Sequence, residues 1–393
     1  MQVSSILKLL LKVAAKASQI ALIIRKEKPL VELLIEEKIG LEKNNRFFQD
    51  FKTLADVLIQ ETVRHYISEK VPNIGASVYG EESNRFTNAV GDSVVVRVCG
   101  TCEETQELLK KVLNGNNEAA LLLAEAVHRN TDDISFDENS FDIDVDTCDC
   151  GIWIDPIGKK SYSKNSTGQY IKGQTGEKDE YGMVVDGLQC VAILIGMFEK
   201  SSGKPILGVA VQPFAEFNEE TNNWSSQTVW GVCYKGVKMT SLKPVVEIPR
   251  DDARVVLSNS ESEQVQNTLK SKFHLVFASG AGYKILATFL GLSNAYVLSH
   301  RSIYRWDCCA GHAILLALGG GIVSYKHALE AAKKSPSPLT KDDLNQLQVN
   351  YVSAAGAISS RRSSISDGTE SLPGIIAYRS VNDALIILEL LKI

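Results

Sequence analysis

Asp155 is the residue of this sequence whose position is best suited to chemistry. It ends an apolar, β-prone run at 151–154 and is followed by Pro156, which cannot donate a hydrogen bond to a sheet ladder. We therefore expect a strand that ends at the rim of a sheet, where loops gather and functional side chains are commonly held. An ordinary Asp-Pro turn that closes a core strand is the alternative explanation of the same residues.

Other acidic residues also stand beside apolar elements. Asp56 lies within an expected helix at 50–70, and the pair Glu81 and Glu82 follows a short β-like run. Asp307 precedes an apolar helical run that three glycines end, so we expect it to be the N-cap of a buried helix. Taken singly, each of these acids has an ordinary explanation as a surface or capping residue.

Two other metal-binding patterns are present only in part. Cys99 and Cys102 have the spacing of half a zinc site, but Cys148 and Cys150 have the wrong spacing for the other half, and the six histidines are scattered. The acidic run at 142–146 resembles a calcium-binding loop, but the turn glycine and the closing acid of such a loop are both replaced. Neither zinc nor calcium is therefore the expected metal.

The composition favours a cytoplasmic protein with a small-molecule partner. The chain has 393 residues, 44% of them hydrophobic, and its 42 basic and 47 acidic side chains give a formal charge of −5. With no basic block, this balance argues against a nucleic-acid surface. Eight cysteines without a recognisable signal peptide favour a reducing compartment. We expect no membrane contact and favour a monomer, while a mitochondrial presequence and phosphorylation of Ser364 stay open.

The hydrophobic pattern predicts mixed helices and strands in two parts. The expected helices cover residues 5–25, 31–43, 50–70, 103–114, 118–128, 284–292 and 341–348, besides the one that starts at Asp307. The expected strands cover residues 94–98, 188–197, 205–212, 230–234, 254–258 and 295–298, besides the run that ends at Asp155. In the first helix Lys8, Lys12 and Lys16 recur every fourth residue and should form one solvent-facing stripe. Prolines between the parts suggest a boundary between residues 1–243 and 252–393.

The contexts of the acids, taken together, resemble one known family. The chain combines Gly-Glu-Glu-Ser at 80–83, Asp-Pro-Ile at 155–157 and Trp-Asp-x-x-Ala at 306–310. These motifs are similar to those of the magnesium-dependent, lithium-sensitive phosphatases related to inositol monophosphatase. Within that superfamily the branch that acts on inositol polyphosphates is the most similar, through the stretches at 33–38, 51–58, 112–116, 187–191, 280–284 and 376–380.

The resemblance implies a fold and an activity. The expected fold is α/β with α+β character, a layered αβαβα sandwich of the inositol monophosphatase and fructose-1,6-bisphosphatase type. The expected reaction removes the 1-phosphate from inositol 1,4-bisphosphate and inositol 1,3,4-trisphosphate, with two or three Mg²⁺ ions and inhibition by Li⁺. The chemistry agrees with an acidic site, because a phosphate monoester dianion repels nucleophiles unless bound cations neutralise it and activate water.

The resemblance also assigns roles to residues. It implies that Glu81, Asp155 and the Ile157 carbonyl hold the first metal, with Glu82 beside them, and that Asp155 and Asp307 contribute to the second. The further roles that it implies concern water and substrate: Asp56 and Thr167 would orient and deprotonate the attacking water, Ser166 and Thr167 would hold the phosphate, and Gly280, Ala281, Gly282 and Lys284 would bind the substrate.

The sequence departs from the family pattern directly after Ile157. Seven residues, 158–164, precede the Asn165-Ser166-Thr167 stretch, and the second aspartate of the family's loop is replaced by Gly158 or Asn165. Losing a carboxylate and inserting three lysines should weaken metal binding. The alternatives are therefore a catalytically impaired relative that binds phosphoinositols or serves as an interaction surface, a 3'(2'),5'-bisphosphate nucleotidase, or an insertion that the natural protein lacks.

Overall fold

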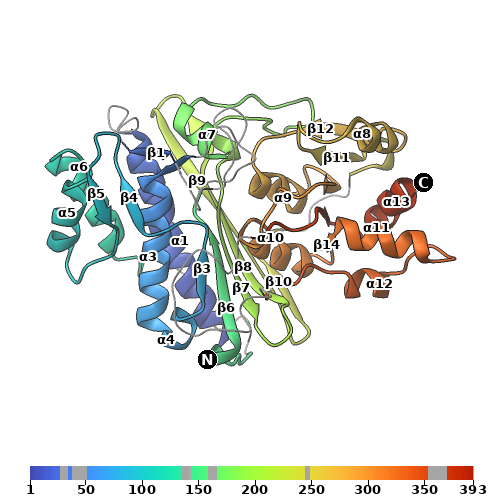
Figure 1. Cartoon of the computed structure of the whole chain (residues 1–393), viewed down its shortest axis with the longest axis horizontal. Helices are drawn as coiled ribbons and strands as arrows, with labels where there is room; N and C mark the ends of the chain where they lie inside the picture. Colours follow the sequence, from blue (N-terminus) through green and yellow to red (C-terminus); the bar gives the residue numbers. More distant parts are fainter. Residues whose placement is uncertain are drawn as a thin grey trace.

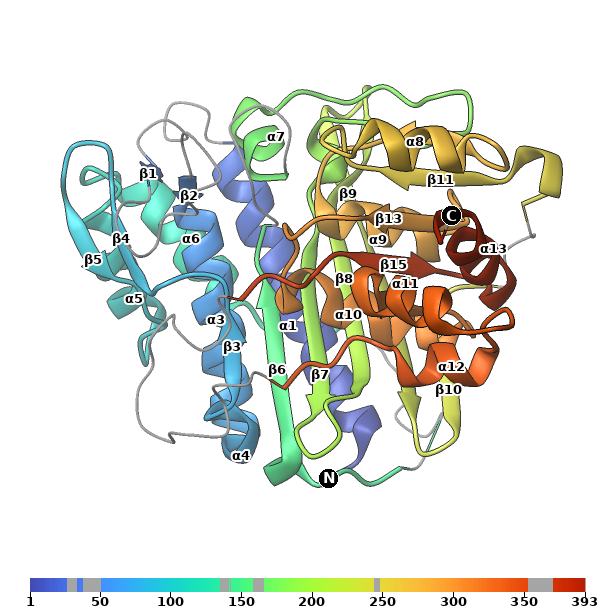
Figure 2. The same ribbon diagram turned by 45° about the vertical axis from the view of Figure 1, so that its right-hand side comes forward.

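Two β-sheets alternate with three helical layers in the computed structural model (Figures 1 and 2). The structure describes residues 1–26, 34–37, 51–134, 141, 143–157, 166–243, 248–352 and 370–392. The strands of one sheet run crosswise to those of the other in the view of Figure 2. The expected layered αβαβα sandwich is confirmed by this order of layers.

The first sheet has six strands in the order β10-β9-β8-β7-β6-β3. Only β3 and β6, at one edge of the sheet, pair in parallel, and all other neighbouring strands are antiparallel. Every residue of β6 is buried, as expected for a strand covered on both faces. The strands are β3 (Val78–Gly80), β6 (Cys150–Asp155), β7 (Ile193–Glu199), β8 (Pro205–Asn218), β9 (Asn223–Tyr234) and β10 (Val237–Thr240).

The second sheet has five short strands in the order β12-β11-β13-β15-β14. The strands β12, β11 and β13 are parallel to one another, and β15 is antiparallel to both of its neighbours. Their bounds are β11 (Arg254–Leu257), β12 (His274–Phe277), β13 (Ala295–Leu298), β14 (Gly321–Ser324) and β15 (Ile375–Tyr378). Two separate two-stranded sheets pair β1 (Ile35–Glu37) with β2 (Phe51–Thr53) and β4 (Arg85–Thr87) with β5 (Ser93–Val95).

The helices form an outer layer on each sheet and a shared layer between them (Figure 1). The outer layer of the first sheet contains α1 (Val3–Lys26) and α3 (Leu54–Lys70), and the shared layer contains α9 (Ala281–Phe289) and α10 (Arg305–Ala317). The outer layer of the second sheet contains α8 (Glu263–Leu269), α11 (Tyr325–Lys334) and α13 (Val381–Leu391). The remaining helices are α4 (Pro72–Gly75), α5 (Cys102–Lys110), α6 (Asn117–His128), α7 (Ser166–Lys172) and α12 (Lys341–Gln346). Among the described residues, no helix is both long enough and apolar enough to span a membrane.

Three hydrophobic cores fill the spaces between these layers. Because side chains alternate along a strand, Ile152 and Ile154 of β6 enter the core beneath α1 and α3, whereas Trp153 enters the core around α9 and α10. The second sheet divides its residues in the same way, with Val256 facing the middle core and Val255 the outer one. The alternating apolar residues of both sheets therefore specify the layered arrangement.

The helix α10 packs very closely against the first sheet because glycines line its path. A Cβ added at Gly196 of β7 would lie 2.5 Å from the Ala310 nitrogen, and one at Gly231 of β9 would lie 2.7 Å from the Ile314 Cα atom. Any larger residue at these positions would have to push the helix away from the strands. The glycines thereby fix the distance between α10 and the sheet.

Several predicted elements have different bounds in the structure. The helix predicted at 31–43 is wrong at Ile35–Glu37, which form β1, while the other described residue of that range, Leu34, lies in a turn. The helix predicted from residue 50 begins instead at Leu54, because Phe51–Thr53 pair with β1 and Thr53 caps the helix. The strand predicted at 188–197 is β7, which starts only at Ile193 after a 3₁₀ turn. In each case, pairing or capping decides the boundary.

The predicted solvent-facing lysine stripe of the first helix is wrong at Lys16. This side chain is only 4% exposed, because α6 covers it, and its ammonium donates hydrogen bonds to the Val127 carbonyl at 2.9 Å and to the Arg129 carbonyl. It also lies 4.6 Å from the centre of the Tyr66 ring. Burial, with a smaller contribution from the nearby Arg129 charge, lowers the pKa of Lys16 to about 8.

Each large sheet takes its strands from one part of the chain. The first sheet uses residues up to Thr240 and the second begins at Arg254, with residues 244–247 outside the described part. However, α10 comes from the second part and packs on β7, β8 and β9 of the first. The division into 1–243 and 252–393 as separate domains stays a prediction.

Candidate active site

Asp155 lies at the end of β6 with its side chain fully buried. Alternation along the strand places it on the same face as Trp153, toward the layer that contains α10. The Trp153 ring lies 6.0 Å from the ring of Trp306, the residue that directly precedes Asp307. The segments that carry the two aspartates, which are far apart in the sequence, therefore pack against each other.

Glu81 is brought to Asp155 by strand pairing. The parallel register of β3 and β6 places Gly80 opposite Ile154, so the residues that follow, Glu81 and Asp155, leave neighbouring strands at the same end. The backbone of Glu82 is fixed by Gln60 of α3, which accepts a hydrogen bond from the Glu82 amide at 2.9 Å and donates one to its carbonyl at 2.6 Å. This clamp joins the glutamate pair to α3.

Asp56 occupies the first turn of the same helix and is 1% exposed. Its Oδ2 atom accepts hydrogen bonds from the Thr53 amide at 2.6 Å and from the Thr53 hydroxyl at 2.7 Å, which forms a capping box. Gln60 stands four residues further along, on the same helical face as Asp56. The capping box fixes the Asp56 carboxylate, and the hydrogen bonds of Gln60 hold the same part of α3 beside Glu82.

Thr53 was not among the predicted site residues. Its signal in the sequence is the Thr-x-x-Asp spacing of Thr53 and Asp56, which is typical of a helix start. Gln60 was also missed, and no local pattern marks it, because its contact with Glu82 joins two separate elements.

Asp307 is not the N-cap of its helix, which corrects the sequence prediction. Tyr304 is the N-cap, and α10 begins at Arg305, so Asp307 is the third residue of the first turn. Its Oδ2 atom accepts a hydrogen bond from the Tyr304 amide at 2.7 Å, and the side chain is 2% exposed. Asp307 therefore has the same local setting as Asp56 in α3.

The two aspartates influence buried tyrosines around the site. Burial, and then the nearby Asp56 carboxylate, raise the pKa of Tyr170 in α7. Burial and the Asp307 carboxylate likewise raise the pKa of Tyr296 in β13. Both phenols therefore stay protonated, and the Tyr170 hydroxyl donates a hydrogen bond to the Ala21 carbonyl at 2.8 Å.

The loop that follows Asp155 is described only at its ends. Ile157 is fully buried, and α7 begins at Ser166. Residues 158–165, which include the inserted segment and Asn165, lie outside the described residues. The same holds for the side chains of Ser166 and Thr167, so their roles stay predictions.

The stretch at 280–284 starts the helix α9. Gly280 has a φ of 77°, which favours glycine, and a Cβ at Gly282 would lie 2.8 Å from the Leu194 Cδ1 atom. Lys284 is 4% exposed and donates hydrogen bonds to the carbonyls of Ala278 at 3.2 Å and Gly280 at 2.9 Å. In this arrangement Lys284 supports the turn before α9, and its contact with substrate stays a prediction, as do those of Gly280, Ala281 and Gly282.

The donor chemistry of this edge fits a hard cation. Carboxylate and carbonyl oxygens are the ligands that Mg²⁺ prefers. Four of the predicted carboxylates are at most 4% exposed: Asp56, Glu82, Asp155 and Asp307. Within the described residues, no three histidine, cysteine or acidic side chains are arranged as a metal site. The described residues thus supply suitable oxygens but do not by themselves form a closed ligand set.

Comparisons with known proteins agree with the motifs. A model of the inositol monophosphatase family matches residues 101–359. The inositol polyphosphate 1-phosphatase of Mus musculus is 42% identical over 399 aligned residues, covering 96% of this chain and 95% of the relative. The Homo sapiens protein of the same name is 40% identical and covers 96% of this chain and 94% of the relative.

More distant matches are weaker. The 3'(2'),5'-bisphosphate nucleotidase 1 of Dictyostelium discoideum is 31% identical but covers only 43% of this chain and 50% of the relative. A solved inositol monophosphatase from Zymomonas mobilis aligns over 96% of both chains at 14% identity, with a TM-score of 0.45. The match of the family model and the identity to relatives over nearly their whole length establish that this chain belongs to the inositol monophosphatase family.

Proposed function

We propose that this protein is a Mg²⁺-dependent phosphatase that removes the 1-phosphate from inositol 1,4-bisphosphate and inositol 1,3,4-trisphosphate. The observation that carries the proposal is the buried Asp155, with Glu81 on the neighbouring strand end and Asp307 on the helix packed beside it. The similarity to inositol polyphosphate 1-phosphatases over 96% of the chain supports the choice of substrate. The nucleotidase alternative has less support, because its match covers less than half of the chain.

In the proposed reaction Glu81, Glu82, Asp155, Asp307 and the Ile157 carbonyl would hold two or three Mg²⁺ ions. When bound, these cations would neutralise the charge of the phosphate dianion and lower the pKa of the attacking water. Asp56 takes the proton of the attacking water, and Thr53 fixes the orientation of its carboxylate through two hydrogen bonds. In this proposal Thr167 helps Asp56 to orient the attacking water.

The substrate is proposed to bind between the starts of two helices. The first turn of α7, with Ser166 and Thr167, offers backbone N–H groups to the phosphate. The stretch Gly280–Gly282 with Lys284 contacts the rest of the inositol polyphosphate. Lys284 acts there by holding the turn that ends at Gly280.

The altered loop at 158–165 sets the level of activity in this proposal. Replacing the second aspartate of the loop removes one negative ligand, and three nearby lysines oppose cations, so we expect weaker Mg²⁺ binding than in relatives that keep the aspartate. Inhibition by Li⁺, a monomeric state and a cytoplasmic location are further parts of the proposal. A relative that binds phosphoinositols without hydrolysing them is the second candidate, which the same loop favours.

The test is phosphate release from inositol 1,4-bisphosphate over a range of millimolar Mg²⁺, with and without Li⁺. We expect Mg²⁺-dependent, Li⁺-sensitive release that Asp155→Asn lowers by at least about a hundredfold, because a central carboxylate is lost. The matched control is Asp342→Asn, which changes an exposed acid of α12 and should leave the rate unchanged. Binding of the bisphosphate without release at any Mg²⁺ concentration would instead establish the non-catalytic candidate.

A further inference from the structure

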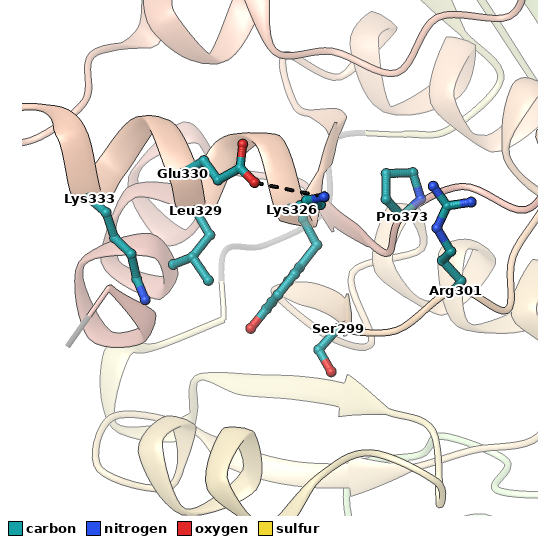
Figure 3. A pocket seen from close by; sticks show the side chains of 8 residues that line it. Ser299, Arg301, Lys326, Leu329, Glu330, Lys333 and Pro373 are labelled. Carbon is teal, nitrogen blue, oxygen red and sulfur yellow. Dashed lines mark ion pairs between the residues drawn. The ribbon is translucent and has the colours of Figure 1, made fainter.

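A pocket of about 310 Å³ lies beside α11 (Figure 3), and its lining includes none of the residues of the candidate active site. Its polar lining consists of Ser299, Arg301, Tyr325, Lys326, Glu330 and Lys333. We propose that this pocket binds a small phosphorylated molecule through its phosphate group. None of the carboxylates placed at the candidate active site lines the pocket, and the inference does not depend on the proposed hydrolysis.

One wall of the pocket is a single face of α11. Lys326, Leu329, Glu330 and Lys333 follow the spacing i, i+3, i+4 and i+7, which places them on the same side of a helix. Figure 3 shows these side chains along the helix. Because a helix holds its side chains at fixed spacing, the charged groups of Lys326, Glu330 and Lys333 stay in a fixed order along this wall.

The opposite wall comes from the end of β13 and the segment before β15. Ser299 directly follows β13, and its amide and hydroxyl donate hydrogen bonds to the buried Glu261, the amide at 2.9 Å. The Tyr325 amide donates a hydrogen bond to the Gly374 carbonyl at 3.1 Å, which joins this wall to α11. Burial, and then the Glu261 carboxylate, raise the pKa of Tyr325, so its hydroxyl stays protonated and able to donate. These contacts fix the pocket's shape before any ligand binds.

The pocket lining carries more positive than negative charge. Three cations, Arg301, Lys326 and Lys333, face one lining acid, Glu330. The ion pair of Lys326 with Glu330 is long, at 3.9 Å, and both side chains are more than half exposed, so the pair is weak. Among the described residues Lys333 forms no ion pair, whereas Arg301 pairs with Glu370 at 3.2 Å. Glu370 offsets the charge of Arg301, and the carboxylate of Glu261 is buried behind Ser299, so Lys333 and the weakly paired Lys326 are the cations that attract an anion to the lining.

Phosphate is the anion that best matches these groups. The ammonium groups of Lys326 and Lys333 and the hydroxyl of Tyr325 supply donors to phosphate oxygens, and Arg301 adds the N–H groups of a planar guanidinium beside its contact with Glu370. The volume is at the lower end of the range for small-molecule sites, which suits a ligand of sugar phosphate size.

The test is titration of the full-length protein with glucose 6-phosphate by calorimetry, in the presence of EDTA so that the acidic edge holds no divalent cation. We expect saturable binding that Lys333→Ala weakens about threefold to tenfold, as one partly exposed charge contact is lost. Lys334→Ala is the matched control, because Lys334 is the exposed neighbour on α11 that does not line the pocket. Glu330→Gln should tighten binding, since it removes the one acid of the lining.

Three results would overturn the proposal. The first is the absence of saturable binding to the wild-type protein. The second is equal affinity of the Lys333→Ala and Lys334→Ala variants, because binding would then lie elsewhere. The third is failure of inorganic phosphate to displace the sugar phosphate, because phosphate is the group that the pocket should recognise. Glucose should not bind, and thermal melts of these surface variants would verify that each is folded.

Discussion

Asp56 and Asp307 each combine two tasks in one carboxylate. Each is the third residue of its helix and uses Oδ2 to accept a hydrogen bond from the N-cap amide. Backbone N–H groups at a helix start stabilise negative charge, which offsets part of the cost of burying an acid. The capping oxygen fixes the orientation of the carboxylate, and the second oxygen, Oδ1, lies outside that capping contact. A common local motif thus places acids of the candidate site.

The Thr53 hydroxyl offers a test of this positioning. Thr53→Val removes the hydrogen bond to Asp56 Oδ2, so we expect phosphate release per folded molecule to fall at least about tenfold in kcat with a smaller change in KM. The helix should also lose about 1 kcal/mol of stability with its cap. Thr53→Ser keeps the hydroxyl and should restore the rate. A Val variant that is less stable but turns over normally would reduce Thr53 to a capping residue.

At the scale of elements, α10 connects the candidate site to the fold. It carries Asp307 in its first turn and passes over glycines of three neighbouring strands, Gly196, Gly208 and Gly231. The position of the carboxylate therefore depends on how closely the whole helix packs on β7, β8 and β9. A displacement of the helix at its middle would move its first turn as well.

Substituting one of these glycines should test that dependence. In Gly196→Ala the new Cβ would meet backbone atoms of Cys309 and Ala310 at 2.6 and 2.5 Å, so we expect a loss of about 1–3 kcal/mol in unfolding free energy and weaker Mg²⁺ activation. Gly100→Ala is the control, because its nearest neighbour is a flexible side-chain atom at 3.5 Å. Urea unfolding and Mg²⁺ titration of phosphate release would measure the two effects. Equal stability of the two variants would contradict the close packing of α10.

At the scale of the whole molecule, a buried polar network joins the middle layer to the second sheet. His312 of α10 is fully buried; its Nε2 donates to the Gln348 Oε1 atom at 2.7 Å, and its Nδ1 accepts from the Tyr351 hydroxyl at 2.9 Å. Gln348 in turn donates to the Tyr378 hydroxyl of β15 at 2.8 Å. The network adds buried polar contacts to the apolar packing between these layers.

This network predicts a loss of stability in acid. Burial lowers the pKa of His312 from its usual value of 6.5 to about 4. Between these two values the unfolded chain binds a proton that the folded protein excludes, so stability falls as the pH falls from 6.5 to 4, by up to about 3 kcal/mol. Compared with the wild type, His312→Asn should show a shallower fall of unfolding free energy in urea titrations across this window. Identical pH profiles would contradict the assignment.

The sequence by itself determined the family, the layered fold and the acids of the candidate site. The motifs are local: Asp155 ends an apolar strand, and the Gly-Glu-Glu-Ser and Trp-Asp motifs are contiguous. They led to the family, and the resemblance to that family implied the layered fold. The αβαβα prediction was confirmed, and most helices and strands were found within a few residues of their predicted bounds.

The tertiary structure alone decided which residues share an environment. The periodicity places Lys16 on a solvent-facing stripe, but α6, which lies more than a hundred residues later in the chain, covers its side chain. The sequence at 35–37 is compatible with a helix, but these residues form a strand because they pair with Phe51–Thr53. The same pairing makes α3 begin only at Leu54, with Thr53 as its N-cap. Gln60 contacts Glu82, and Trp306 meets Trp153, through packing between separate elements. Local pattern sets what a segment can form, but burial and pairing depend on distant partners, which only the folded chain brings together.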